Sequence, residues 1–304
     1  MDSPRTVLVA IGGNALAGSG QPGTIPEQRD RARVIAAAIV QVIADGARVL
    51  VTHGNGPQVG AALLRSECAA ALTYPLPLDV CDAATQGEIG YLLQQVLQAE
   101  LARAGIAVPV ATVVTQVVVS DADPAMTRST KPVGAGGGGG RRRLVPSPEP
   151  LVVVEEAVIR QLFESGVVVV AAGGGGIPVV RRGPDLIGVE AVVDKDSTSA
   201  LLASRLKIDQ LVIAMDADRI YLHYGTPGQQ PLDRVTTAEL EGWEREGRFP
   251  AGSMGPKVRA ALRFLRDGGR EVVVCSFDQL PAAVQGRGGT HIIPGPTDRP
   301  SSYS

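Results

Sequence analysis

A run of valines that ends in four glycines constrains the fold of this chain more than any other stretch. Residues 167–178 read VVVVAAGGGGIP. A short valine-rich run without polar alternation is typical of a strand buried on both faces of a parallel sheet. The glycines follow at its carboxyl end, where open α/β sheets bind ligands. We expect them to bring backbone N–H groups to the surface, where they suit an anion such as phosphate. A tight turn without a ligand remains the alternative for this one segment.

Two further predicted strands end in the same way. Residues 6–11 (TVLVAI) run into Gly-Gly-Asn at 12–14, and residues 47–52 run into Gly-Asn-Gly at 54–56. The strand–helix–strand order predicts a parallel sheet, so the three glycine clusters should lie at one edge. Three clusters exceed what ordinary turns require. The chain has neither GxxxxGK[ST] nor GxGxxG after its first strand, which argues against a Walker site and a dinucleotide-binding domain.

Composition excludes several other classes of protein. The chain has 304 residues, 44% of them hydrophobic, and a net charge of −2, which disfavours binding to nucleic acid or to a membrane surface through bulk charge. No apolar run approaches the length of a membrane span, and the first residues do not resemble a signal peptide. The three cysteines show no CxxC spacing, so no metal site is predicted. We expect a cytoplasmic protein.

The remaining elements follow from periodicity and from glycine and proline. A small hairpin is expected over 179–187 and a short edge strand over 288–294, and residues 106–119 read as one strand with a continuation. Residues 117–150, which include five consecutive glycines at 136–140, are interpreted as an excursion from the sheet, either a lid or a plain linker. Helices are predicted over 27–44, 58–71, 83–104, 155–165, 200–206, 236–246 and 253–266.

Lysine is rare enough to single out. Only four of the 29 basic residues are lysines. Lys131 lies in the excursion, Lys195 lies beside Asp196, and Lys257 follows Gly-Pro at a predicted helix start. Phosphoryl transfer needs positioned charge above all, and ammonium groups over a glycine floor would supply it. We expect Asp196 to hold lysine side chains in place, and we expect Lys207, which has no glycine cluster beside it, to be solvated.

Long motifs then carry a resemblance that runs in order from about residue 6 to 294. The chain is similar to the carbamate kinases of the amino acid kinase family. The motifs are IGGNAL (11–16), VTHGNGPQVG (51–60), QGEIGYLLQQVL (86–97), TKPVG (130–134), RRLVPSP (142–148), AAGGGGIPVV (171–180), GVEAVVDKD (188–196) and GSMGPKV (252–258).

The resemblance implies a three-layer αβα sandwich around a central, mostly parallel, eight-stranded open sheet. It implies a single domain, with the acceptor half at 1–150 and the nucleotide half at 151–304. The implied reaction is reversible phosphoryl transfer between ATP and carbamate, which forms ADP and carbamoyl phosphate, in arginine or other nitrogen-compound catabolism. Mg²⁺ held mainly by the ATP phosphates and a homodimer are implied as well.

The resemblance also assigns site residues by their match to its motifs. The acceptor side matches Gly12, Gly13, Asn14, Gly54 and Asn55. The lysines that contact phosphate match Lys131, Lys195 and Lys257, with Asp196 as their organiser. The nucleotide side matches Gly174, Gly175, Asp216, Tyr221 and Met254, together with Lys195 and Lys257.

Two departures from the family pattern leave alternatives open. The segment at 134–142 is shorter than the lid of the family, and Met215 stands where a threonine is usual. Arg219 is expected to reach a phosphate or to be solvated. The alternatives are a kinase of the same fold that acts on another small carboxylate or phosphonate, and a non-catalytic nucleotide-binding relative.

Overall fold

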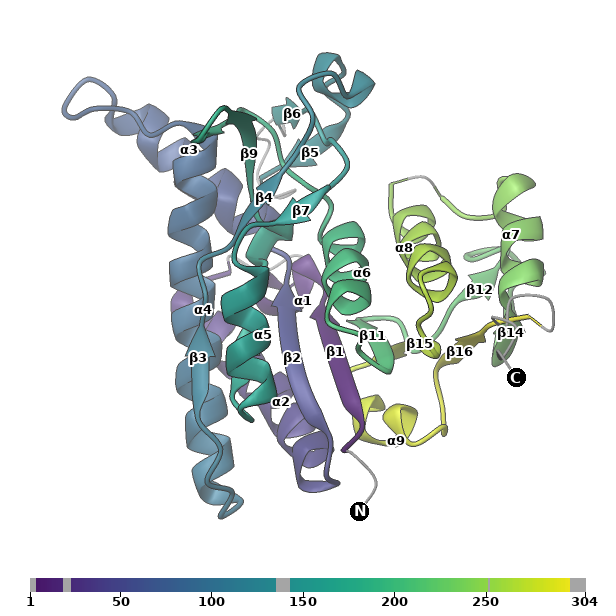
Figure 1. Ribbon diagram of the computed structural model, residues 1–304. Coiled ribbons are helices and arrows are strands. Elements are labelled where there is room, and N and C mark those ends of the chain that lie inside the picture. Colours follow the sequence, from purple (N-terminus) through teal and green to yellow (C-terminus); the bar gives the residue numbers. More distant parts are fainter. Residues whose placement is uncertain (1–3, 19–22, 135–142, 251, 296–304) are drawn as a thin grey trace.

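A computed structural model of the chain describes residues 4–18, 23–134, 143–250 and 252–295. A central sheet is covered by helices on both faces, so the molecule has three layers (Figure 1). The predicted αβα sandwich is therefore confirmed. The five glycines at 136–140 and the end of the chain at 301–304 lie outside the described residues.

The central sheet has eight strands in the order β14-β16-β15-β11-β1-β2-β8-β3. Its neighbouring strands pair in parallel except for β15 and β16, which are antiparallel. The strands are β1 (Thr6–Ile11), β2 (Arg48–His53), β3 (Val110–Thr112), β8 (Val168–Val170), β11 (Gln210–Met215), β14 (Arg234–Thr236), β15 (Glu271–Ser276) and β16 (Thr290–Ile293).

Alternating side chains of the central strands build two cores, one on each face of the sheet. Along β1, Val7 and Val9 pack with the helices of one face, and Leu8 and Ala10 pack with those of the other. All four are fully buried. Both faces are covered, so these strands can be apolar throughout, which is the pattern that the sequence shows. The first core takes side chains from α2 (Ile25–Ala44), α4 (Leu78–Arg103) and α9 (Leu280–Val284), and the second from α5 (Glu156–Glu164), α6 (Lys195–Arg205), α7 (Thr237–Arg245) and α8 (Met254–Arg266).

Three smaller sheets and the remaining short elements complete the fold. The predicted hairpin is confirmed, because β9 and β10 pair antiparallel, whereas residues 106–119 divide between the central sheet (β3) and a second sheet (β4). That second sheet has the order β10-β9-β4-β7, and the other two pair β5 with β6 and β12 with β13. These elements are α1 (Gly13–Ala17), α3 (Gly56–Ala69), β4 (Gln116–Val118), the 3₁₀ turn η1 (Pro124–Thr127), β5 (Lys131–Val133), β6 (Arg143–Val145), β7 (Val152–Val153), η2 (Gly173–Gly175), β9 (Ile177–Arg182), β10 (Asp185–Gly188), β12 (Tyr221–Leu222) and β13 (Gln230–Pro231).

The main error of the sequence-based prediction concerns the edge of the sheet. Residues 288–294 were expected to form an edge strand, but β16 lies between β15 and β14, and β14 is the edge. Three-residue β14 is too short to stand out in a sequence pattern. Helix starts also differ by a few residues. Helix α2 begins at Ile25 because Thr24 and Glu27 form a capping box, with Thr24 N–H donating to Glu27 Oε2 at 2.7 Å.

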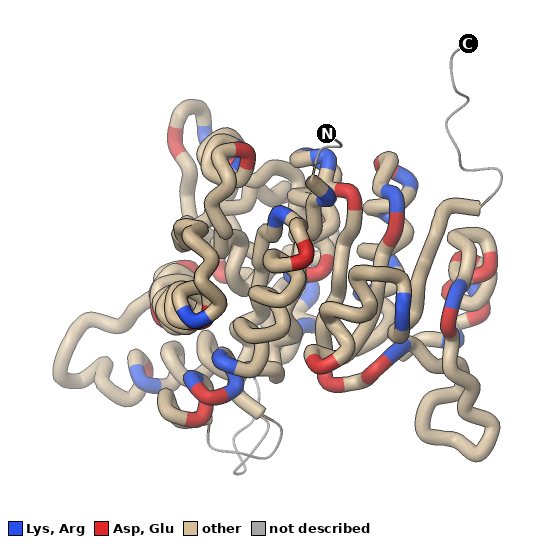
Figure 2. The backbone as a smooth tube through the Cα atoms, turned by 90° about the horizontal axis from the view of Figure 1, so that it is seen from below, with Lys and Arg blue, Asp and Glu red and all other residues tan. Residues whose placement is uncertain are grey.

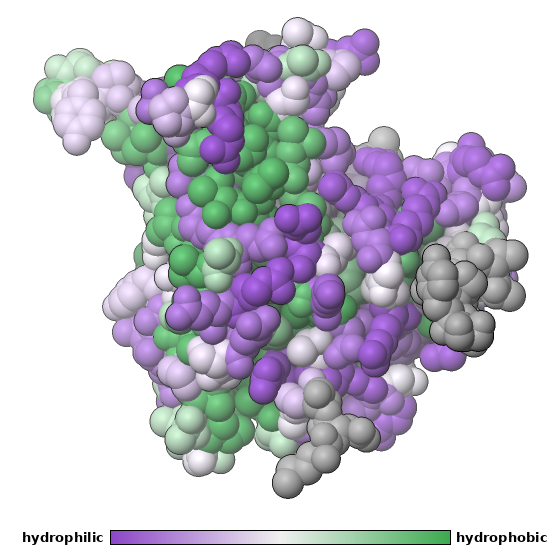
Figure 3. Space-filling view, viewed as in Figure 1, coloured by the Kyte–Doolittle hydropathy of each residue, from purple (hydrophilic) through white to green (hydrophobic). Residues whose placement is uncertain are grey.

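Residues of both charge signs alternate along the described part of the backbone. Lysine, arginine, aspartate and glutamate are interspersed along the chain (Figure 2). Figure 3 shows an apolar area over the second sheet, where Leu151, Val152 and Ile187 are exposed on or beside β7 and β10. Within the described residues, no helix combines the length and apolarity needed to cross a bilayer.

Candidate active site

The three glycine clusters lie side by side at one edge of the central sheet. They follow β1, β2 and β8, which are neighbours in the strand order. The clusters approach one another closely, because a Cβ on Gly54 would lie 2.6 Å from Gly13 Cα and 3.4 Å from the Lys195 side chain. Substitution of Gly54 would therefore require the backbone to shift. The predicted site residues Gly12, Gly13, Gly54 and Lys195 are brought together here.

The Gly-Gly-Gly-Gly turn is buried, which corrects the expectation that it exposes backbone N–H groups. Gly175 N–H donates to Ala172 O at 3.1 Å, and Gly176 N–H donates to Gly173 O at 2.9 Å. Gly174 and Gly175 have φ values of +69° and +97°, a region open to glycine at little cost. A Cβ on Gly174 would lie 2.4 Å from Asn55 Nδ2. The turn thus packs against a residue predicted to bind the acceptor.

Two of the predicted lysines share one carboxylate. Lys195 Nζ donates to Asp196 Oδ1 at 2.5 Å, and Lys257 Nζ donates to Asp196 Oδ2 at 3.1 Å. Lys195 and Asp196 lie in the first turn of α6, whereas Lys257 lies in the first turn of α8. The side chain of Asp196 is 4% exposed, so both of its oxygens are used within the protein. Asp196 therefore holds the two lysines in place, as predicted.

Asp194 is a further residue of this cluster that sequence reasoning missed. It accepts a hydrogen bond from Lys131 Nζ at 2.7 Å through Oδ2. Its other oxygen accepts from the backbone N–H groups of Asp196 and Ser197 and caps α6. The helix was predicted only from residue 200, whereas α6 begins at Lys195, so Asp194 was not read as the N-cap that it is. The third lysine is thus tied to the helix that carries the first.

Burial and ion pairing oppose each other in this cluster. Burial lowers the pKa of Lys195, and the adjacent Asp196 carboxylate works against that effect. Burial alone would raise the pKa of Asp196, but Lys195 and Lys257 outweigh it and hold the pKa below its usual value. The pKa of Asp194 is likewise lowered, because Lys131 outweighs the effect of burial. Both carboxylates are therefore ionised at neutral pH. By contrast, Lys207 is exposed, in keeping with its predicted solvation.

A buried polar layer lies beneath the clusters, and the sequence did not single it out. Asn55 Nδ2 donates to Asp82 Oδ1 and to Thr85 Oγ1, the latter at 2.8 Å. Burial raises the pKa of Asp82 to about 7, and burial lowers the pKa of His53 to about 4. Gln86 Nε2 donates to Gly173 O at 2.9 Å and so ties α4 to the glycine turn. The layer gives the glycine floor a rigid polar support.

The residues predicted for the nucleotide side are dispersed more widely. Met254 lies one turn before Lys257 on α8 and packs partly buried against the second core, while Asp216 is exposed after β11. Tyr221 Oη donates to Asp218 Oδ1 at 2.7 Å. Within the described residues, neither Asp216 nor Tyr221 shares a hydrogen bond or ion pair with the lysine cluster. Asn14, at the start of α1, belongs to the glycine edge rather than to this side.

Of the residues that depart from the family pattern or lie beside a departure, Met215 and Arg219 are within the described part of the chain. Arg219 forms ion pairs with Asp218 and Asp233, so its guanidinium is held by carboxylates and is not simply solvated. Met215 is partly buried against the second core and lies beside Gly12. The short segment at 134–142 falls almost wholly outside the described residues.

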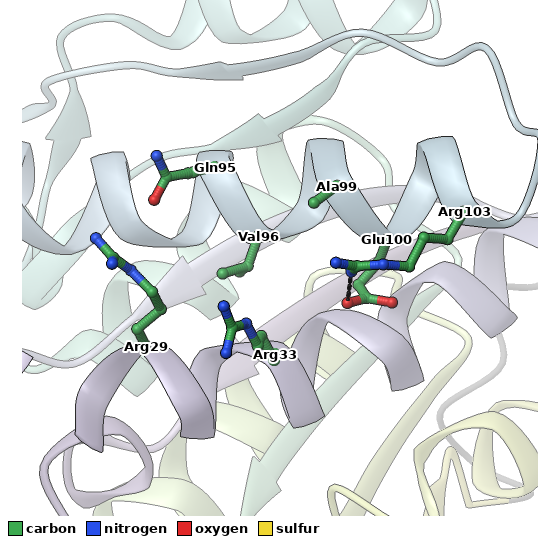
Figure 4. A pocket seen from close by; sticks show the side chains of 7 residues that line it. All are labelled: Arg29, Arg33, Gln95, Val96, Ala99, Glu100 and Arg103. Carbon is green, nitrogen blue, oxygen red and sulfur yellow. Dashed lines mark hydrogen bonds and ion pairs between the residues drawn. The ribbon is translucent and has the colours of Figure 1, made fainter. Parts of the chain in front are cut away.

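A separate cavity of about 150 Å³ lies between α2 and α4 (Figure 4). Arg29, Arg33 and Arg103 line it, and Arg103 pairs with Glu100. It shares no residue with the glycine clusters or the lysines. The described residues contain no group of three or more histidines, cysteines or carboxylates that could hold a metal ion.

Comparison with known proteins places this geometry in context. Residues 5–276 match the amino acid kinase family. The chain is 42% identical to a carbamate kinase of Pyrococcus horikoshii, with 96% of this chain and 100% of that protein covered. It is 44% identical to the carbamate kinase-like protein YahI of Escherichia coli, with 94% and 98% covered. The structure superposes on a carbamate kinase from Giardia lamblia bound to AMP-PNP with a TM-score of 0.92 and 36% identity, covering 97% of this chain and 100% of that one.

Proposed function

The chain belongs to the amino acid kinase family, and from that premise we propose that it is a carbamate kinase that transfers a phosphoryl group reversibly between ATP and carbamate. One observation carries the proposal. Asp196 holds Lys195 and Lys257, at 2.5 and 3.1 Å, beside the glycine clusters that end three adjacent strands. Positioned ammonium groups over a floor of small residues are what transfer between two anions requires.

The catalytic roles follow from charge. In the forward direction a carbamate oxygen attacks the γ-phosphorus, and the bond from that phosphorus to the bridging oxygen of ADP breaks. Negative charge spreads over the transferred group, and we assign Lys131, Lys195 and Lys257 to neutralise it. Asp196 orients lysines and does not touch substrate. The protein forms no covalent intermediate in this scheme, because positioning and electrostatics suffice.

The two substrates are assigned to different parts of the edge. Carbamate is assigned to Gly12, Gly13, Asn14, Gly54 and Asn55. ATP is assigned to the carboxyl-terminal half, with Gly174, Gly175, Asp216, Tyr221 and Met254. The support for this assignment is the match to the family motifs and the position of Lys257 one turn after Met254.

Magnesium is proposed to enter as Mg-ATP. The carboxylates nearest the phosphate lysines, Asp194 and Asp196, are both occupied by ammonium groups. Donors for Mg²⁺ must then come mainly from phosphate oxygens and water, which this ion favours. Bound in that way, Mg²⁺ would neutralise charge on the β- and γ-phosphates.

The direct test is ATP formation from ADP and carbamoyl phosphate by the wild-type protein and by Lys195→Ala. Activity in the wild type and a loss of at least a hundredfold in the variant are expected. Background ATP from both proteins would refute the proposal. Thermal stabilisation by Mg-ATP without turnover would instead favour a non-catalytic relative. Trials with other small acyl phosphates and with phosphonates would find an alternative acceptor.

The remaining parts of the proposal concern the setting of the enzyme. We infer a cytoplasmic homodimer that acts in arginine or other nitrogen-compound catabolism. Support for a dimer is the apolar area over β7 and β10 (Figure 3). All three cysteines are free, which suits a reducing compartment. Light scattering of the purified protein would measure the oligomeric state.

A further inference from the structure

We propose that Asp82 and Thr85 are positioning residues that turn the amide of Asn55 so that its carbonyl oxygen faces the acceptor and takes a hydrogen bond from the N–H of carbamate. This inference rests on the proposed function and goes beyond it, because it names what distinguishes carbamate from other small carboxylates. The orienting residues lie on α4, beneath the glycine edge.

The hydroxyl group of Thr85 fixes which end of the Asn55 amide points toward α4. Thr85 Oγ1 donates its one proton to Asp82 O at 2.8 Å. It can therefore only accept from Asn55, and an acceptor must face the NH₂ end of the amide. The distance from Asn55 Nδ2 to Thr85 Oγ1 is 2.8 Å. The orientation of the amide follows from this proton count.

Asp82 accepts a hydrogen bond from the second N–H of the same NH₂ group. Asn55 Nδ2 donates to Asp82 Oδ1, so both of its protons are used inside the protein. Among the described residues, none donates to Asn55 Oδ1. Asn55, which carries the free carbonyl oxygen, lies two residues after the end of β2 and just before α3. It adjoins Gly54, whose neighbours in space are Gly13 and Lys195. It is the part of the side chain left for a ligand.

Other features of the contact between Asn55 and Asp82 indicate a role beyond packing. Asp82 is fully buried, and its Oδ2 has no hydrogen-bond partner. A carboxyl group in that position is costly for stability. Gly174 leaves room for the pair, because a Cβ there would lie 2.4 Å from Asn55 Nδ2 and 2.6 Å from Asp82 Oδ1. The glycine turn and the buried carboxyl are thus parts of one arrangement around Asn55.

The orientation has a chemical consequence for selectivity. A carbonyl oxygen repels the oxygens of a carboxylate, whereas it accepts a hydrogen bond from an N–H group. Carbamate and carbamoyl phosphate carry NH₂ where acetate and acetyl phosphate carry a methyl group. A site that presents this oxygen therefore favours carbamate and penalises acceptors without a donor at that position.

The test compares kcat/KM for ATP formation from carbamoyl phosphate and from acetyl phosphate. In the double variant Thr85→Val with Asp82→Asn, the amide of Asn55 can turn over, because the new amide can donate to it and the hydroxyl is gone. The preference for carbamoyl phosphate should fall about two- to tenfold, the worth of one hydrogen bond, through the carbamoyl phosphate rate alone. Thr85→Ser, which keeps the hydroxyl, should retain the wild-type preference.

Each outcome decides the matter. An equal loss with both substrates in the double variant would overturn the inference and leave the proposed function intact. A wild-type protein without carbamoyl phosphate activity would remove the proposed function instead.

Should the double variant not fold, Thr85→Val alone serves as the test. The preference of this variant for carbamoyl phosphate over acetyl phosphate should be lower at pH 6 than at pH 8. Burial raises the pKa of Asp82 to about 7, and at the lower pH the protonated carboxyl of Asp82 can donate to the amide oxygen of Asn55. The charged groups that act on Asp82 are Asp79 on the same helix and Lys131 from β5. Equal preference at both pH values would overturn the inference.

Discussion

Replacing Asp196 by asparagine tests the central electrostatic argument. The substitution keeps the shape of the side chain and removes the negative charge that Lys195 and Lys257 share. The two ammonium groups then face each other across a neutral amide, with side chains 10% and 18% exposed. Asp194 is the other carboxylate that acts on Lys195, and Lys131 already occupies it.

The magnitude follows from burial. Breaking a buried ion pair by neutralising one partner costs about 3–5 kcal/mol, so the free energy of unfolding should fall by that order near neutral pH. Burial already lowers the pKa of Lys195 in the folded protein, and loss of the carboxylate lowers that pKa further. The unfolded chain then binds more protons, so the destabilisation should shrink as the pH rises.

Urea unfolding and initial rates with carbamoyl phosphate measure the two effects. Loss of a preorganised cation is worth about 10²–10³ in kcat, and the alkaline fall of the rate should begin at lower pH in the variant because Lys195 loses its proton earlier. Asp121→Asn is the matched control. It breaks an exposed pair with Arg182 at 2.6 Å and should change neither stability nor rate measurably. An Asp196→Asn protein with wild-type kcat and an unshifted alkaline limb would refute the reasoning.

Three further predictions concern Gly174, Asp82 and Lys131. Gly174→Ala should destabilise the protein by at least 1–3 kcal/mol, because its Cβ would meet Asn55 at 2.4 Å. Gly183→Ala, with φ +59° and no atom nearby, should cost only about 1–2 kcal/mol, and equal costs in thermal unfolding would contradict the packing argument. Because burial raises the pKa of Asp82 from 3.8 to about 7, the folded protein binds more protons between those values, and stability is lost as the pH rises through them. Asp82→Asn should therefore gain stability relative to wild type between pH 5 and pH 8, by up to about 4 kcal/mol in urea unfolding, and a pH-independent difference would exclude this. Lys131→Met should raise KM for carbamoyl phosphate about tenfold or more while moving the unfolding midpoint little, since its pair with Asp194 is partly exposed; an unchanged KM would remove Lys131 from the site.

Local patterns predicted the scaffold and the charged centre well. Uninterrupted apolar runs marked β1 and β8, because strands buried on both faces need no polar side chains. The scarcity of lysine drew attention to Lys195 and Lys257. In the structure both contact Asp196, which is next to Lys195 in the sequence and is brought to Lys257 by the fold. The strand predictions succeeded because each depended on one short segment, whereas the roles of the lysines in binding and catalysis stay predictions.

The sequence by itself determined the α/β architecture and the glycine-ended strands, and it singled out three lysines as candidates. Only the tertiary structure decided that β14 is the edge strand, that Asp194 holds Lys131, and that the four-glycine turn is buried against Asn55 and Asp82. The physical reason is that these outcomes depend on contacts between segments far apart along the chain. Residues 55, 82 and 174 meet only once the strands and helices have packed, and neither periodicity nor turn chemistry carries that information.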